Sequence, residues 1–205
     1  MIMDMQPTGR RAEYAEQTRR AILEAARTLF TEQGYFATKV DQIAGAARVA
    51  PATVYAVGGG KSGLLRTLIE SAVNSEENAR IHAELAAVTD PESLLATVVG
   101  ATRAKFEQWA PLMRQVAAAA PQEPTVRDSM KIAEASLRNG LRLTAERLAQ
   151  LDALSDGIDV DRAQDLLWIY LSNTAYFVRT DDLGWSLDES QSWLTAALTR
   201  ELLAR

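Results

Sequence analysis

The sequence predicts an all-α fold of about nine helices. Apolar residues recur at steps of three and four along almost the whole chain, which is the period of an amphipathic helix. Alternating runs of β-branched and aromatic residues closed by tight-turn dipeptides are missing from the sequence. Of the 205 residues, 47% are hydrophobic, which is enough to build a sizeable core.

Three helices are predicted near the N-terminus. The first runs from Glu13 to Gln33 and carries its apolar residues on one face. Thr38 is expected to cap the second helix, with Asp41 three positions on as its capping-box partner. The third is short, because Pro51 suits its first position and the glycines at 58–60 end it.

Six further helices follow, separated by proline, glycine and capping residues. Their expected bounds are Ser62–Leu85, Asp90–Trp109, Pro111–Ala120, Pro124–Leu151, Val160–Arg179 and Leu187–Arg205.

Charge is divided unevenly along the chain. The net charge is -5, yet the stretch up to Arg66 has nine basic and six acidic residues, a net of +3. The remainder therefore has a net charge of -8. A basic head on an acidic body is typical of a protein in which one end meets phosphate.

Several classes of site and location are disfavoured by composition. The chain has no cysteine, so disulfides and thiolate metal sites are excluded. No apolar run is long enough to span a bilayer, and residues 1–8 lack the apolar core of a signal peptide. We expect a cytoplasmic protein with no membrane partner.

The N-terminal region resembles a known family. The second and third helices, joined by a tight turn, match a helix-turn-helix. The stretches at 34–44 (GYFATKVDQIA), 53–55 (TVY) and 61–65 (KSGLL) resemble the TetR/AcrR family of repressors. The resemblance implies a DNA-binding domain at 10–66 and a helical ligand-binding and dimerisation domain at 67–205, with a homodimer formed through the last two helices.

The resemblance also implies roles for individual residues in binding double-stranded DNA. Thr38 would cap its helix and touch a phosphate, Tyr55 and Lys61 would hold phosphates, and Thr53 would face bases or phosphate. Further contacts are expected from Lys39, Arg48, Pro51, Ala52 and Val57.

The recognition surface departs from the family pattern. Ala56, Val57 and Gly58 stand where the family commonly has a polar or basic residue and an aromatic pair, and Ala50 replaces the usual serine cap. The side chains presented by the third helix cannot form a bidentate bond to a base. We therefore expect sequence readout through thymine methyl groups and DNA shape, or through Lys39 and Arg48.

A ligand site is expected among large side chains of the acidic body. Aromatic residues with a few polar groups can line a pocket, although they can equally pack a core. Trp168, Ser172 and Tyr176 stand at i, i+4 and i+8 and are expected on one helix face. The candidate set is Phe106, Trp109, Met113, Trp168, Ser172, Asn173 and Tyr176.

Signals for catalysis are weak. Gly58–Ser62 resembles the end of a phosphate-binding loop, but Tyr55 stands where that motif needs a glycine, and a helix precedes it rather than a strand. His82 is the only histidine, and we expect it to be exposed or partly packed. We expect no catalytic residues, no metal site and no cofactor.

The sequence is best explained by a ligand-responsive transcriptional regulator, most simply a repressor. It would bind a palindromic operator as a homodimer and be released by an unidentified small molecule in the C-terminal domain. Two alternatives are a helical nucleotide-binding protein or enzyme that uses Gly58–Ser62, and a helical adaptor that binds other proteins. Effector, operator, regulated genes and the sign of regulation are left open.

Overall fold

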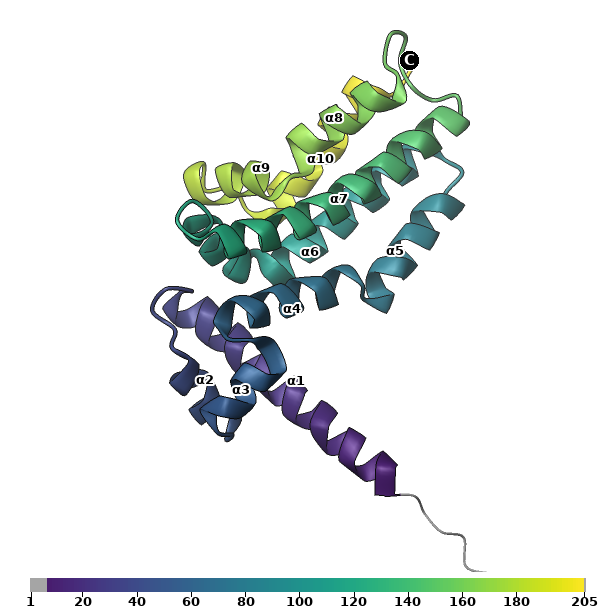
Figure 1. The fold of residues 1–205 in the computed structure, drawn as a ribbon. Helices are drawn as coiled ribbons and strands as arrows, with labels where there is room; N and C mark the ends of the chain where they lie inside the picture. The colour runs from purple at the N-terminus through teal and green to yellow at the C-terminus, as the bar shows by residue number, and fades with distance from the viewer. Residues whose placement is uncertain (1–6, 205) are drawn as a thin grey trace, which may run out of the picture. The chain divides into compact units, whose positions relative to one another are not determined.

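A computed structural model describes residues 7–204 of the chain. Within this range the fold is all-α, as predicted, with ten α-helices and one π-helical turn (Figure 1). The contacts divide the described residues into two compact units, one of 7–71 with 114–130 and one of 72–113 with 131–204. The predicted functional division at 66/67 stays a prediction.

The first unit contains the N-terminal helices. Its core is formed by apolar residues of these helices, together with the end of α6 (Pro91–Ala119) and the start of α7 (Pro124–Gln150). The N-terminal helices are α1 (Pro7–Gln33), α2 (Val40–Ala47), α3 (Pro51–Gly58) and α4 (Lys61–Val73). Fully buried Ile22, Phe30, Ile43, Val54 and Leu64 lie at the centre of this core.

The second unit is built from longer helices around one apolar core. Its core residues include Leu94, Leu95, Leu148, Leu167 and Leu198, all without exposed surface. Helices α8 and α10 lie side by side in it (Figure 1). The elements are α5 (Glu76–Ala87), α6 (Pro91–Ala119), α7 (Pro124–Gln150), α8 (Val160–Leu171), α9 (Asn173–Phe177), η1 (Val178–Asp182) and α10 (Leu187–Leu202).

Two predicted helices are divided in the structure. The predicted helix 62–85 is interrupted at Ser75, whose hydroxyl accepts the N–H of Asn78 and so begins α5. The predicted helix 160–179 is interrupted at Ser172, whose backbone is extended (ψ 155°) and whose hydroxyl accepts the N–H of Ala175. The one-face alignment of Trp168, Ser172 and Tyr176 is therefore wrong.

Two other predicted helices are joined. Pro111 lies inside α6, which runs without a break from Pro91 to Ala119. A proline removes one intrahelical hydrogen bond, and the cost is smallest where water can reach the carbonyl left without a partner. Pro111 is exposed, which fits that condition.

The ends of the first and last helices also differ from the prediction. Helix α1 begins at Pro7 rather than Glu13, and α10 ends at Leu202. Beyond it, Leu203 forms an isolated antiparallel bridge with Leu154, supported by a hydrogen bond from Ser155 N to Leu202 O of 2.8 Å. Arg205 lies outside the described residues. Among the described residues, no helix is long and apolar enough to cross a membrane.

Candidate nucleic-acid interface and ligand cleft

Helices α2 and α3 form the predicted helix-turn-helix. The turn between them is fixed by Arg48, which adopts a left-handed conformation (φ 56°) and closes α2 with N–H bonds to the last carbonyls. Val49 N donates to Ala44 O over 3.0 Å. Pro51 then begins α3 after an extended Ala50, which makes no side-chain cap.

Helix α3 presents a small apolar surface to solvent. Val54 is fully buried and attaches the helix to the head, whereas Tyr55 is 56% exposed. Pro51 and Ala52 are exposed, and Thr53 and Val57 are partly buried. The exposed face therefore consists of small apolar groups and one phenol, without a guanidinium or carboxamide group.

Thr38 lies inside the head. Its side chain is 1% exposed, and its hydroxyl donates to Gly34 O (2.8 Å) and Leu29 O (3.2 Å). The predicted cap was wrong by one residue, because Lys39 is the N-cap of α2 and Gln42 Oε1 accepts the Lys39 N–H over 2.7 Å. The exposed Lys39 thus stands at the start of α2, and the phosphate contact of Thr38 stays a prediction.

Lys61 fastens α4 to the loop that joins α1 and α2. Its ammonium group donates to the carbonyls of Tyr35 (2.9 Å), Phe36 (3.4 Å) and Thr38 (3.3 Å). It also lies 4.5 Å from the centre of the Tyr35 ring, a cation–π contact. This side chain therefore has a structural role within the N-terminal helices. Its predicted contact with a phosphate stays a prediction.

Tyr35 is a core residue of the N-terminal helices. It is buried and packs against Phe30 with ring centres 5.5 Å apart. Burial, reinforced by the negative charge of Glu123, raises the pKa of the Tyr35 phenol. The hydroxyl is hydrogen-bonded in this environment to Thr125 and Ser62, which act in the opposite direction.

The glycine-rich corner between α3 and α4 is a packing device. A Cβ at Gly63 would lie 1.7 Å from the carbonyl oxygen of Gly58, which is impossible without movement of the backbone. The corner follows helix α3, whereas a phosphate-binding loop follows a strand. Gly58 and Gly63 are therefore explained by the close approach of the two helices, whereas Gly59 and Gly60 have positive φ values of 66° and 107°.

The structure does not gather the predicted ligand residues into one site. Phe106 and Tyr176 stack in the core with ring centres 4.5 Å apart. Met113 is also buried. Trp168 lies under the Arg138 guanidinium, 3.8 Å from its ring centre. Asn173 is partly buried at the start of α9.

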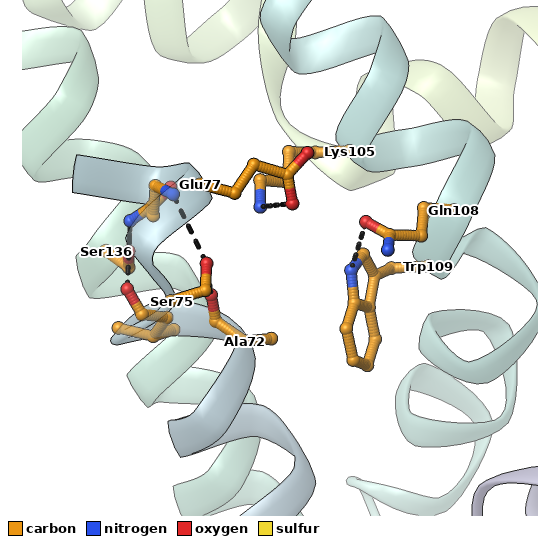
Figure 2. A network of polar contacts seen from close by, with 9 residues as sticks. Ala72, Ser75, Glu77, Lys105, Gln108, Trp109 and Ser136 are labelled. Carbon is orange, nitrogen blue, oxygen red and sulfur yellow. Dashed lines mark hydrogen bonds and ion pairs between the residues drawn. The ribbon is translucent and has the colours of Figure 1, made fainter. Parts of the chain in front are cut away.

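An open cleft of about 590 Å³ lies between α5 and α7. Asn78 Nδ2 donates to Val73 O (3.0 Å) and to Ser136 Oγ (3.5 Å), bonds that Figure 2 draws together with Ser75. The lining groups that carry polar atoms are uncharged amides, hydroxyls and an imidazole. They include Ser75, Asn78, His82, Ser136 and Asn139, beside apolar Ile132.

Sequence reasoning missed this cleft. Its signal is a polar stripe at helical spacing: Asn78 and His82 are one turn apart on α5, as are Ile132 and Ser136 on α7. Gly140 permits the approach of the two helices, since a Cβ there would lie 3.3 Å from His82 Nε2. Near the cleft, Glu77 and Lys105 pair over 3.3 Å, and Trp109 donates to Gln108 Oε1 over 2.9 Å (Figure 2).

An apolar surface is exposed on the C-terminal helices of the second unit. Ile169 on α8 is 60% exposed and Trp193 on α10 is 41% exposed. Trp193 contacts Tyr170 and Trp185, with ring centres 5.7 and 5.4 Å apart. Large aromatic side chains at a solvent-exposed surface are typical of a protein interface.

Comparisons with solved structures identify the fold. A Saccharomonospora viridis protein in complex with choline aligns over 93% of this chain and 100% of its own, with a TM-score of 0.76 and 21% identity. NalD, the secondary repressor of the MexAB-OprM efflux pump of Pseudomonas aeruginosa, aligns over 93% and 98% (TM-score 0.70, 23% identity). The Bacillus subtilis regulator FadR, bound to stearoyl-CoA, aligns over 88% and 97% (TM-score 0.71, 19% identity).

The match to a family model is limited to the N-terminal helices. Among curated proteins, none matches the chain by sequence. Residues 22–68 match the model of bacterial regulatory proteins of the tetR family, and this range contains α2, α3 and the start of α4. Residues 22–68 therefore form a helix-turn-helix domain similar to that of the tetR family of bacterial regulatory proteins.

Proposed function

We propose that the protein binds operator DNA with the exposed face of α3 in the major groove. The observation that carries this proposal is the exposure of Pro51, Ala52 and Tyr55 on a helix whose other face is anchored by buried Val54. Tyr55 and Lys39 are exposed and within reach of a duplex backbone that lies along this face. They hold phosphates in this arrangement.

Sequence readout rests on apolar contacts. Ala52 and Val57 meet thymine methyl groups, and Arg48 and Lys39 supply hydrogen bonds to base edges or to a narrowed groove. Such a surface recognises thymine by its methyl group and does not read the hydrogen-bonding edges of the purines. The preferred operator is therefore rich in A·T pairs at the positions beneath α3.

Gel-shift assays on DNA that flanks the protein's own gene, followed by selection from random duplexes, test this function. We expect salt-sensitive binding to a palindrome, with a linear fall of log affinity against log salt. Ala52→Gln places a carboxamide in the groove and should shift the selected sequence towards adenine at one position of each half-site. Ala86→Gln, an exposed position on α5, is the control and should leave the selected sequence unchanged.

The regulator acts as a homodimer, because a palindrome needs two heads at a fixed spacing of about 34 Å or a multiple of it. The exposed aromatic surface of α8 and α10 supplies the contact between subunits. An isologous interface uses the same surface on both copies, so the Trp193 cluster of one protomer faces that of its partner.

A small molecule releases the protein from its operator by binding the α5–α7 cleft. The ligand must bind the released state more tightly than the DNA-bound state, typically by about 1–3 kcal/mol. Helices α6 and α7 each have residues in both units, so they provide a covalent route between the cleft and the head.

A thermal-shift screen followed by a matched pair of variants tests the effector site. Ala79 lines the cleft and Ala83, one turn further along α5, does not. Compounds that raise the melting temperature of the wild-type protein should lose this effect with Ala79→Leu and keep it with Ala83→Leu. A compound that stabilises the A79L variant equally binds elsewhere, which would reject the cleft as the effector site.

A further inference from the structure

Arg179 is a buried cation in the second unit. It lies in the π-helical turn η1, and its side chain is 6% exposed. Its Nε donates to Ser190 Oγ on α10 over 2.8 Å, and its guanidinium carbon is 4.6 Å from the centre of the Tyr176 ring. Its Nη2 is buried and has no hydrogen-bond partner within the described part of the chain.

Among residues 7–204, no carboxylate is seen to form an ion pair with this guanidinium. The nearby ion pair joins Asp188 to a different arginine, Arg103, over 2.6 Å. Burial lowers the pKa of the Arg179 guanidinium, and the opposing influence comes from the Tyr176 phenol rather than from an acid. An arginine stays protonated in proteins, so a positive charge and a free donor are held away from water.

The surroundings of Nη2 are suited to an anion with an apolar body. Ser190 is fully buried, and the Tyr176 hydroxyl lies 3.5 Å from the Thr102 hydroxyl. The Tyr176 ring stacks on Phe106, so an aromatic surface adjoins the polar groups. Arginine with neighbouring hydroxyls is a common arrangement for recognition of a carboxylate.

The guanidinium precedes an exposed segment of the chain. Residues 181–184, which follow Thr180, are all exposed. Gly184 has a positive φ of 71°, which marks a sharp turn. A π-helical turn is frequently found at a functional site, because it gives up regular helix geometry to place a side chain.

We propose that Arg179 binds the carboxylate of a small organic acid, with Nη2 donating to a carboxylate oxygen. The bound anion completes the hydrogen bonding of the guanidinium and neutralises its charge. This site is separate from the α5–α7 cleft and does not depend on DNA binding.

Calorimetric titration and thermal shift with benzoate, at constant ionic strength set by chloride, test the proposal. Benzamide has the same shape without the charge and is the matched neutral probe. We expect benzoate to bind with at least a tenfold higher affinity than benzamide. At ten times its Kd it should raise the melting temperature by about 3–6 °C.

Variants locate the binding site. Arg179→Met removes the buried cation and keeps an apolar chain of similar length, so it should fold and lose the response to benzoate. Arg162→Met, at an exposed arginine of α8, should keep the full response. If Arg179→Met does not fold, the benzoate-to-benzamide ratio on the wild-type protein still decides the question.

Three outcomes would overturn the proposal. The first is equal binding of benzoate and benzamide, or no binding of either. The second is an unchanged benzoate response in Arg179→Met. The third is loss of the dimer in Arg179→Met without any benzoate effect on the wild type, which would assign the anion to a carboxylate of the partner subunit. Since none of these measurements uses DNA, failure here leaves the proposed operator binding unaffected.

Discussion

The ammonium group of Lys61 contacts three carbonyl oxygens of the loop between α1 and α2. Tyr35, Phe36 and Thr38 connect the end of α1 to the start of α2, and their carbonyls point to one ammonium group. An ammonium group has three donors, so the three carbonyls match its capacity. A phosphate would compete with these carbonyls for the same donors.

Replacing Lys61 by methionine separates the structural role from a phosphate contact. We expect Lys61→Met to lower the free energy of unfolding by about 1–3 kcal/mol, because hydrogen bonds to a charged group are lost while the carbonyls stay partly buried. Urea unfolding measures this change. Lys39→Met is the control at an exposed site, with an expected change within about 0.5 kcal/mol. A Lys61 variant of wild-type stability whose operator binding depends less on salt would instead identify a phosphate ligand.

The buried phenol of Tyr35 makes the head sensitive to alkali. Its folded-state pKa is raised above the ordinary 10.0, so near pH 10 the unfolded chain releases this proton first. The contribution of Tyr35 to stability is complete below pH 10 and is lost as the pH rises through the folded-state pKa. We expect Tyr35→Phe to flatten the fall of stability above pH 10, measured by denaturant unfolding at a series of pH values. Tyr14→Phe, at a 65% exposed tyrosine, is the comparison, and an equal effect of both would contradict this assignment.

At the scale of the element, Ser172 decides whether the chain forms one helix or two. Periodicity is continuous across it, but the extended backbone at Ser172 and the hydroxyl bond to Ala175 N begin a new helix. Serine competes with helix continuation through such local hydrogen bonds.

Ser172→Ala tests this break, because the free energy of unfolding should change in opposite directions for two separate helices and for one continuous helix. With a cap lost from α9, the free energy of unfolding should fall by about 1 kcal/mol. Within an unbroken helix the same change would raise it, because alanine is the better helix former. Ser192→Ala is the comparison for helix propensity, at an exposed position inside α10 where the hydroxyl bonds only to Asp188 O of the same helix among the contacts seen. Both are measured by urea unfolding.

The sequence predicted elements well where local chemistry decides, and less well where tertiary contacts do. Pro51 at the start of α3 is such a local signal and is confirmed, and Ser186 caps α10 in the same local way. Pro111 is a strong helix breaker locally, yet α6 continues through it, with Pro111 exposed and Leu112 and Met113 buried. The one-residue error at Thr38 arose because its hydroxyl bonds back to α1, a contact that spacing along the chain does not reveal.

The candidate sites divide in the same way. The exposed positions of α3 follow from helix geometry and could be named from the sequence. The cleft depends on which faces of α5 and α7 pack against each other. In the sequence, a single residue, Gly140, indicates that α7 approaches α5 near His82. For Phe106 and Tyr176 the sequence left pocket and core open, and the structure places both in the core.

At the scale of the whole molecule, the proposed activity requires two chains. Each chain carries one helix-turn-helix, and a single α3 buries too little surface for tight, specific binding. Joining two heads makes the second contact intramolecular and raises the apparent affinity by roughly 10²–10⁴. Loss of the dimer should therefore weaken operator binding at least a hundredfold without unfolding the helix-turn-helix domain.

Substitutions on the exposed aromatic surface test this requirement directly. Trp193→Glu and Ile169→Glu place a charge where the proposed interface excludes water, so each should produce a monomer and weaken operator binding at least a hundredfold. Light scattering after size exclusion gives the mass, and a gel shift gives the affinity. Leu143→Glu introduces the same charge at a 38% exposed leucine of α7 and should leave both readings unchanged. If the Trp193→Glu variant is a dimer with full operator affinity, the interface lies elsewhere. If the wild-type protein is a monomer that binds a single half-site, operator binding does not require a dimer.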